Sequence, residues 1–192
     1  MTNKKERVGL FGGSFNPIHV GHLIMAERVR ETLGLDKIYF MPTNIAPHVD
    51  TKKNLPADVR VEMVKLAIQE NPYFELELVE MEREEKSYTY DTIRILKERY
   101  PDREYVFIIG GDMVEYLPKW YKIEDLLTEV QFVAVARKGY HATSPYPVLW
   151  VENPVIEISS TLVRNACANE QSIRYYVPES VRMYIEQKEL YR

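Results

Sequence analysis

Residues 12–22 read Gly12-Gly13-Ser14-Phe15-Asn16-Pro17-Ile18-His19-Val20-Gly21-His22. They follow a short apolar run over residues 8–11 and lead into a helical pattern that begins at His22. A strand, a glycine turn and a helix start in this order are typical of an open α/β sheet, where such turns bind phosphate groups. This segment therefore predicts both an α/β fold and an anion-binding site at its first turn.

The glycines and histidines of this segment are the residues that suggest chemistry. Gly12 and Gly13 let the backbone turn sharply and approach a ligand closely. His19 and His22 are three residues apart, so we expect them to share a helix face and to donate hydrogen bonds to an anion. A Gly-Gly turn alone is often only structural, but the histidine pair favours a functional site. Zinc is less favoured because no third ligand is evident.

Apolar segments alternate with helical patterns along the rest of the chain. The predicted strands are Arg7–Phe11, Lys37–Met41, Phe74–Val79, Tyr105–Ile109, Gln131–Ala136, Val148–Val151 and Val155–Ile158. The predicted helices are His22–Leu33, Ala57–Glu70, Tyr90–Tyr100, Ser160–Ala168 and Glu179–Lys188. Strands that are apolar on both faces and separated by helices indicate a mostly parallel sheet covered on both sides. We therefore predict a Rossmann-like, doubly wound α/β fold in a single domain over residues 1–192.

Composition limits the class of protein and of partner. The chain has 192 residues, 45% of them hydrophobic and 28% charged, which fits a globular protein with a substantial core. A net charge of −4 provides no basic field, so we expect no nucleic-acid partner. No apolar run approaches the roughly 20 residues of a membrane span, so we expect no membrane partner. Cys167 is the only cysteine, which favours a cytoplasmic setting.

The segment Ser159-Ser160-Thr161-Leu162-Val163-Arg164 lies where a predicted strand ends and a helix begins. One serine or threonine at such a point is a common helix cap and needs no further function. Consecutive hydroxyl groups followed by an arginine one turn later exceed what a cap requires. Hydroxyls, free helix N–H groups and a guanidinium together are suited to binding a polyphosphate.

Three further segments leave two interpretations open. In Gly110-Gly111-Asp112, the aspartate either caps a helix or accepts hydrogen bonds from a ribose. Trp120 either covers the core or stacks on a planar ligand. The segment Ser87-Tyr88-Thr89-Tyr90-Asp91-Thr92 either caps a helix or presents N–H groups and hydroxyls to an anion. The charged run from Glu80 to Lys86 is interpreted as a solvated loop.

The first turn and the Ile158–Arg164 segment together resemble the nucleotidyltransferase superfamily, whose members carry a (T/H)xGH motif and an SSTxxR-type motif. Within it, the chain is similar to bacterial nicotinate mononucleotide adenylyltransferases. That similarity rests on residues 42–44 with Pro47-His48, on residues 87–92 and 107–112, on Leu117-Pro118-Lys119-Trp120, and on residues 172–178. The resemblance spans nearly the whole chain. It implies transfer of AMP from ATP to nicotinate mononucleotide, with Mg²⁺ carried by ATP and no metal held by protein ligands.

The resemblance also implies a set of site residues. His19, His22 and Arg164 correspond to the catalytic set. The implied ATP-binding residues are Gly12, Gly13, Ser14, Phe15, His19, His22, Gly110, Asp112, Ile158, Ser159, Ser160 and Arg164. The implied mononucleotide-binding residues are Asn44, His48, Ser87, Thr89, Trp120 and Tyr121. Because the phosphate of the mononucleotide is itself the nucleophile, the protein has to align the substrates and stabilise charge.

Two alternatives to this function remain. The first is phosphopantetheine adenylyltransferase or another transferase of the superfamily, against which the Thr89 and Trp120 segments argue. The second is a nucleotide-sensing module without catalysis, which would not need both histidines and Arg164. The acid or amide form of the mononucleotide and the oligomeric state stay open, with a homodimer as one option.

Overall fold

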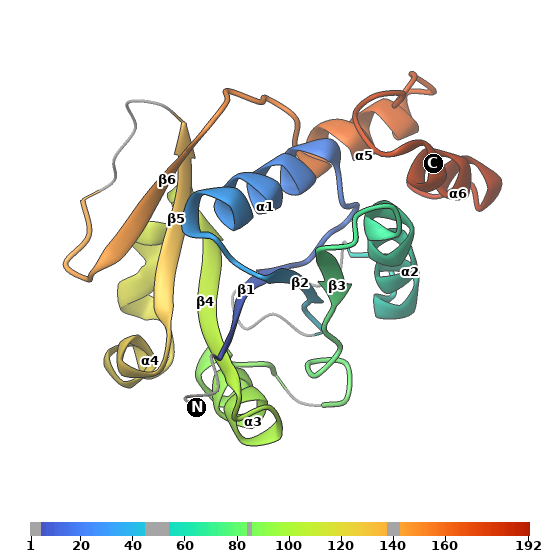
Figure 1. The fold of residues 1–192 in the computed structure, drawn as a ribbon. Helices are drawn as coiled ribbons and strands as arrows, with labels where there is room; N and C mark the ends of the chain where they lie inside the picture. Colours follow the sequence, from blue (N-terminus) through green and yellow to red (C-terminus); the bar gives the residue numbers. More distant parts are fainter. Residues whose placement is uncertain (1–4, 45–53, 84–85, 138–142) are drawn as a thin grey trace.

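The computed structural model describes residues 5–44, 54–83, 86–137 and 143–192. Its centre is a six-stranded sheet in the order β3-β2-β1-β4-β5-β6, with every neighbouring pair parallel (Figure 1). The strands are β1 (Glu6–Gly13), β2 (Lys37–Pro42), β3 (Phe74–Leu76), β4 (Arg103–Gly110), β5 (Gln131–Arg137) and β6 (Val148–Asn153). The predicted doubly wound, parallel sheet is confirmed.

Helices cover both faces of the sheet (Figure 1). One face carries α1 (Val20–Leu33), α2 (Ala57–Ile68), α5 (Ser160–Ala168) and α6 (Glu179–Gln187). The other carries α3 (Thr89–Arg99), the 3₁₀ helix η2 (Gly111–Lys119) and α4 (Ile123–Glu129). Side chains alternate between the two faces of a sheet, so successive strand residues pack against different helices. Phe11 and Ile108 pack on the face covered by α1, and Leu10 and Phe107 on the face covered by α3.

The strand order reverses between β1 and β4, which lie side by side at the middle of the sheet. The chain runs outward from β1 through β2 to β3, and from β4 through β5 to β6. The connections after β1 and β4 therefore leave in opposite directions and open a crevice at the carboxyl ends of these strands. Gly12-Gly13 and Gly110-Gly111 lie at this crevice.

Two predicted strands differ from the structure. No strand forms over Val155–Ile158, because β6 is already the edge of the sheet and the chain leaves it at Pro154. Val155 is 62% exposed there, so its apolar side chain is not a sign of sheet pairing. The strand predicted over Phe74–Val79 pairs with β2 only over Phe74–Leu76. Beyond Leu76 the chain turns instead of extending the edge.

The helices after β4 lie outside the predicted helix ranges, although one interpretation of Asp112 places a helix start there. Pro118 lies inside η2, and Lys122 adopts a left-handed conformation immediately before α4. These two features divide the segment into short helices that a search for long periodic patterns overlooks. The buried side chains of α2 also differ from a simple apolar stripe, since Arg60 is buried together with Met63 and Val64.

Candidate active site

Two neighbouring cavities open at the crevice between β1 and β4. The first, of about 660 Å³, is lined by Phe11, Gly12, His19, His22, Met25, Gly110, Gly111, Asp112, Val135, Ala136, Asn153, Pro154, Ile156, Ile158 and Ser159. The second, of about 290 Å³, is lined by Gly12, Gly13, Ser14, Met41, Thr43, Glu80, Ser87, Tyr88, Thr89, Phe107, Ile109, Gly110, Met113, Trp120 and Tyr121. Gly12 and Gly110 line both cavities, so the two spaces adjoin at the ends of β1 and β4.

Because Gly12 and Gly110 carry no side chains, backbone atoms border the junction between the two cavities at these positions. A Cβ atom at Gly110 would lie 2.6 Å from Oδ1 of Asp112, so any side chain there displaces the carboxylate. A Cβ atom at Gly12 would lie 3.2 Å from the ring of Phe107. A ligand that extends from one cavity into the other therefore passes close to backbone atoms at both strand ends.

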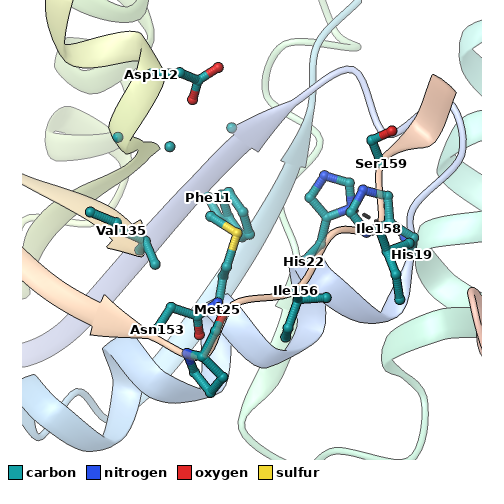
Figure 2. A pocket seen from close by; sticks show the side chains of 15 residues that line it. Phe11, His19, His22, Met25, Asp112, Val135, Asn153, Ile156, Ile158 and Ser159 are labelled. Atoms are coloured by element: carbon teal, nitrogen blue, oxygen red, sulfur yellow. Dashed lines mark hydrogen bonds between the residues drawn. The ribbon is translucent and has the colours of Figure 1, made fainter. Parts of the chain in front are cut away.

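The two histidines lie together at the start of α1, in the first cavity (Figure 2). His19 is the residue immediately before the helix and His22 lies in its first turn, so the expected common helix face is only approximate. Their rings are stacked with centroids 3.7 Å apart. Gly21 permits this arrangement, because a Cβ atom there would lie 3.0 Å from Nδ1 of His19.

A backbone hydrogen bond determines which nitrogen of His22 carries the proton. The N–H of His19 donates to Nδ1 of His22 over 3.2 Å. Nδ1 is thus an acceptor, and in the neutral ring the proton resides on Nε2, which can donate to a ligand. Nδ1 of His19 is buried and has no hydrogen-bond partner among the described residues.

Both histidines are neutral in the structure at pH 7. Burial lowers the pKa of His19 to about 4. Burial, and then the neighbouring His19, holds the pKa of His22 well below its ordinary value. The pair therefore offers N–H donors instead of positive charge to an incoming anion.

The predicted polyphosphate clamp on α5 is only partly assembled around the first cavity. Ile158 and Ser159 line it, and the Ser159 hydroxyl caps α5 by accepting from the N–H of Leu162 over 3.1 Å. Ser160 and Arg164 do not line either cavity in this structure. Ser160 Oγ donates to the carbonyl of Pro17, and Arg164 Nη1 to the carbonyl of Asn16, each over 2.8 Å.

These two contacts join α5 to the turn that precedes α1. Arg164 also donates to Thr161 Oγ1 over 3.0 Å, so its guanidinium is held at the base of the turn. The structure thus shows Ser160 and Arg164 supporting the turn before α1. A direct contact of either residue with phosphate stays a prediction.

The remaining predicted residues fall into three groups. Phe15 is 2% exposed and packs against Phe11 and Phe40, so its side chain belongs to the core, and its part in ATP binding stays a prediction. Asn44 lies outside both cavities, and its amide donates to the carbonyl of Arg83 over 2.9 Å. His48 lies outside the described residues.

The second cavity brings the predicted Ser87, Thr89, Trp120 and Tyr121 together with Gly13 and Ser14. The indole of Trp120 is edge-on to Phe107 and Phe132, with centroids 5.9 and 5.7 Å apart. Trp120 therefore packs on the core and also lines the cavity, and its stacking on a planar ligand stays a prediction.

Two buried charged residues near the site escape prediction from the sequence. Glu80 is 3% exposed and lines the second cavity, so its place in a solvated loop is wrong. Burial raises the pKa of Glu80 to about 7. The flanking apolar Val79 and Met81 are the one sequence signal against a solvated position.

Arg60 is the other such residue. It donates to the carbonyls of Ser14, Thr43 and Leu55 over 2.6, 2.9 and 3.0 Å. It thereby ties the first glycine turn to the segments that follow β2 and precede α2. The sequence signal for its burial is that Arg60 lies three and four residues before the apolar Met63 and Val64, on the same helix face.

Within the described ranges, no group of three or more His, Cys, Asp or Glu side chains could hold a metal ion. None of the helices in the described part of the chain combines the length and apolar character that a membrane span requires.

A parallel sheet with a cavity at the switch point of its strand order is typical of the nucleotide-binding α/β class. The chain belongs to the cytidylyltransferase-like family, whose model matches residues 10–166. It is 50% identical over 186 residues to the nicotinate-nucleotide adenylyltransferase of Bacillus subtilis, covering 97% of this chain and 98% of the relative. A probable nicotinate-nucleotide adenylyltransferase of Enterococcus faecalis is 52% identical over 188 residues, 98% of this chain and 86% of the relative.

A solved structure extends this comparison to the fold. The Plasmodium falciparum nicotinic acid mononucleotide adenylyltransferase complexed with NaAD superposes with a TM-score of 0.79 over 97% of both chains. Its sequence identity to this chain is 21%, so the match concerns the fold.

Proposed function

We propose that the protein transfers AMP from ATP to nicotinate mononucleotide, giving nicotinate adenine dinucleotide and pyrophosphate. The oxygen of the mononucleotide phosphate attacks the α-phosphorus of ATP, and the bond from that phosphorus to the leaving pyrophosphate breaks. Relatives about half identical over nearly the whole chain carry the name of this activity. The protein is accordingly a nucleotidyltransferase of NAD biosynthesis.

The observation that carries the proposal is the meeting of two unlike cavities at Gly12 and Gly110. The first has a histidine pair at a helix start, which suits the phosphates of ATP. The second has Trp120 and Tyr121, which suit a flat pyridine ring. Two substrates bound in this way would bring their phosphates together at the shared glycines, where the transfer has to occur.

The residues have distinct parts in this reaction. His22, with its proton on Nε2, donates to a phosphate oxygen whose charge grows in the transition state. His19 stacks on His22 and stabilises its orientation. We expect Mg²⁺ to arrive with ATP as part of the substrate, bound mainly by phosphate oxygens and water.

Arg164 retains donors for a phosphate. Its guanidinium binds the carbonyl of Asn16 and the hydroxyl of Thr161 through one N–H each, and among the described residues the other N–H groups of the fork stay available. We propose that these remaining donors bind the triphosphate of ATP while the present hydrogen bonds keep the guanidinium in place. Cytoplasmic location, a single domain over residues 1–192 and a homodimer stay predictions.

Transfer of a labelled α-phosphate tests the proposed reaction. The protein is incubated with Mg²⁺, ATP labelled at the α-phosphorus and nicotinate mononucleotide, and the products are separated. We expect the label in the dinucleotide and one pyrophosphate released for each dinucleotide formed. Binding of ATP without pyrophosphate release would instead indicate a nucleotide sensor, and label in free AMP would indicate hydrolysis.

A further inference from the structure

The second cavity contains more unpartnered polar atoms than a purely apolar ring site would need. Oε2 of Glu80, Oγ of Ser87 and Nε1 of Trp120 are all buried and lack hydrogen-bond partners among the described residues. All three residues line this cavity. Since unpaired buried polar atoms cost free energy, their convergence on one cavity indicates a polar ligand group there.

The hydrogen bonds around Glu80 distinguish its two carboxyl oxygens. Thr92 Oγ1 donates to Oε1 of Glu80 over 3.2 Å and also lies 3.1 Å from the carbonyl of Tyr88, while Arg83 Nη1 donates to the same hydroxyl over 3.4 Å. Oε1 therefore has a donor, and Oε2 is the oxygen without a partner among the described residues.

The positive charge near Glu80 is shared with a second carboxylate. Arg83 is the cation that acts on Glu80, but Arg83 also lies 4.0 Å from Asp91 on α3. Tyr88 and Tyr121 are the other titratable groups that line the same cavity. Burial dominates over Arg83 and raises the pKa of Glu80 to about 7.

We propose that Glu80 binds the carboxylate of the acid-form mononucleotide through a proton on its own carboxyl group, and is a specificity-determining residue of the second cavity. The proposal rests on the proposed function. Because Oε1 accepts from Thr92, a proton on Glu80 lies on the unpartnered Oε2, from which it can be donated to the ligand. An O–H···O⁻ bond of this kind is among the stronger hydrogen bonds in proteins.

The protonation state of Glu80 then separates two related ligands. A protonated Glu80 can donate to a carboxylate or accept from a carboxamide. An ionised Glu80 repels the carboxylate but still accepts from the carboxamide. Raising the pH above about 7 should therefore selectively weaken binding of the acid-form mononucleotide. Titrating groups that affect both ligands equally cancel in the ratio of the two kcat/KM values.

The test compares kcat/KM for nicotinate and nicotinamide mononucleotides between pH 6 and pH 9. We expect the acid-to-amide ratio to be flat below pH 7 and to fall about tenfold per pH unit above it. Glu80→Gln keeps a neutral hydrogen-bonding group of the same size, so its ratio should not change with pH. Glu98→Gln alters an exposed acid on α3 and should behave as the unmodified protein does.

Calorimetry of the unmodified protein gives a second readout that needs no variant. Titration with each mononucleotide near pH 8, in buffers of different ionisation enthalpy, reports protons taken up on binding. We expect close to one more proton for the acid form than for the amide form. A ratio independent of pH, or equal proton uptake for both ligands, would overturn the role of Glu80. Absence of dinucleotide from either mononucleotide would instead overturn the proposed function.

Discussion

His22 is held in one tautomer by the backbone of His19, and this hydrogen bond determines what the ring can offer to a ligand. A neutral imidazole with its proton on Nε2 donates without adding charge, so the increase in negative charge during phosphoryl transfer is met by a preorganised donor. Burial of the pair keeps both rings neutral at pH 7. The spacing of the histidines predicts their proximity, but not this choice of tautomer.

Replacement of His22 tests its donor role. We expect His22→Ala to fold and to reduce the rate of pyrophosphate release about 100-fold or more, because one transition-state donor is lost. Ile24→Ala, on the same helix but against a different surface cavity, should leave the rate nearly unchanged. Unchanged pyrophosphate release in folded His22→Ala would remove the histidine from the mechanism.

The lowered pKa of His19 predicts a pH dependence of stability. Between about pH 4 and pH 6.5 the unfolded chain binds a proton at His19 that the folded protein does not, so stability falls as the pH is lowered through this range. At about pH 5 this amounts to roughly 2 kcal/mol for His19. Urea unfolding of the unmodified protein and of His19→Asn at pH 5 and pH 7 measures it. An equal pH dependence in both proteins would contradict a buried neutral ring.

The position of Trp120 predicts that its replacement affects the two substrates differently. Because its indole lines only the second of the two cavities, Trp120→Ala should raise the KM for nicotinate mononucleotide up to about tenfold and leave the KM for ATP nearly unchanged. Trp120→Phe retains an aromatic ring and should recover part of the loss. A similar loss for both substrates would place the indole in the core alone.

At the scale of elements, the turn before α1 is held from two sides by segments distant in sequence. Ser160 and Arg164 of α5 bind its carbonyls at Pro17 and Asn16, and Arg60 of α2 binds the carbonyl of Ser14. The sequence predicts both helices and the importance of the α5 segment. It does not predict these contacts, because they depend on the packing of α2 and α5 on one face of the sheet.

The hydrogen bonds of Arg60 predict that its replacement lowers the stability of the fold. Arg60→Met leaves three carbonyls without their donor, so we expect the free energy of unfolding to fall by about 3 kcal/mol or more. Arg94→Met, at an exposed position on α3, serves as the control and should change much less. Urea midpoints of the two variants measure the difference. Equal midpoints would show that Arg60 does not support the turn.

At the scale of the whole molecule, the reversal of strand order between β1 and β4 places two glycine turns at one crevice. The alternation of apolar strands and helices is sufficient to predict a parallel, doubly wound sheet, and the motifs predict which turns carry the site. What the sequence leaves open is set by long-range packing. Because β6 is the edge strand, the sheet ends before Val155. Glu80, next to the buried Val79, is itself buried.

The two adjoining cavities are proposed to bind ATP and nicotinate mononucleotide for transfer of AMP between them. The steady-state kcat/KM for pyrophosphate release with Mg²⁺ and ATP tests this proposal, measured in parallel with nicotinate mononucleotide and with phosphopantetheine, with the dinucleotide product identified by mass. We expect efficient turnover with nicotinate mononucleotide and little with phosphopantetheine. Faster turnover with phosphopantetheine would contradict the account.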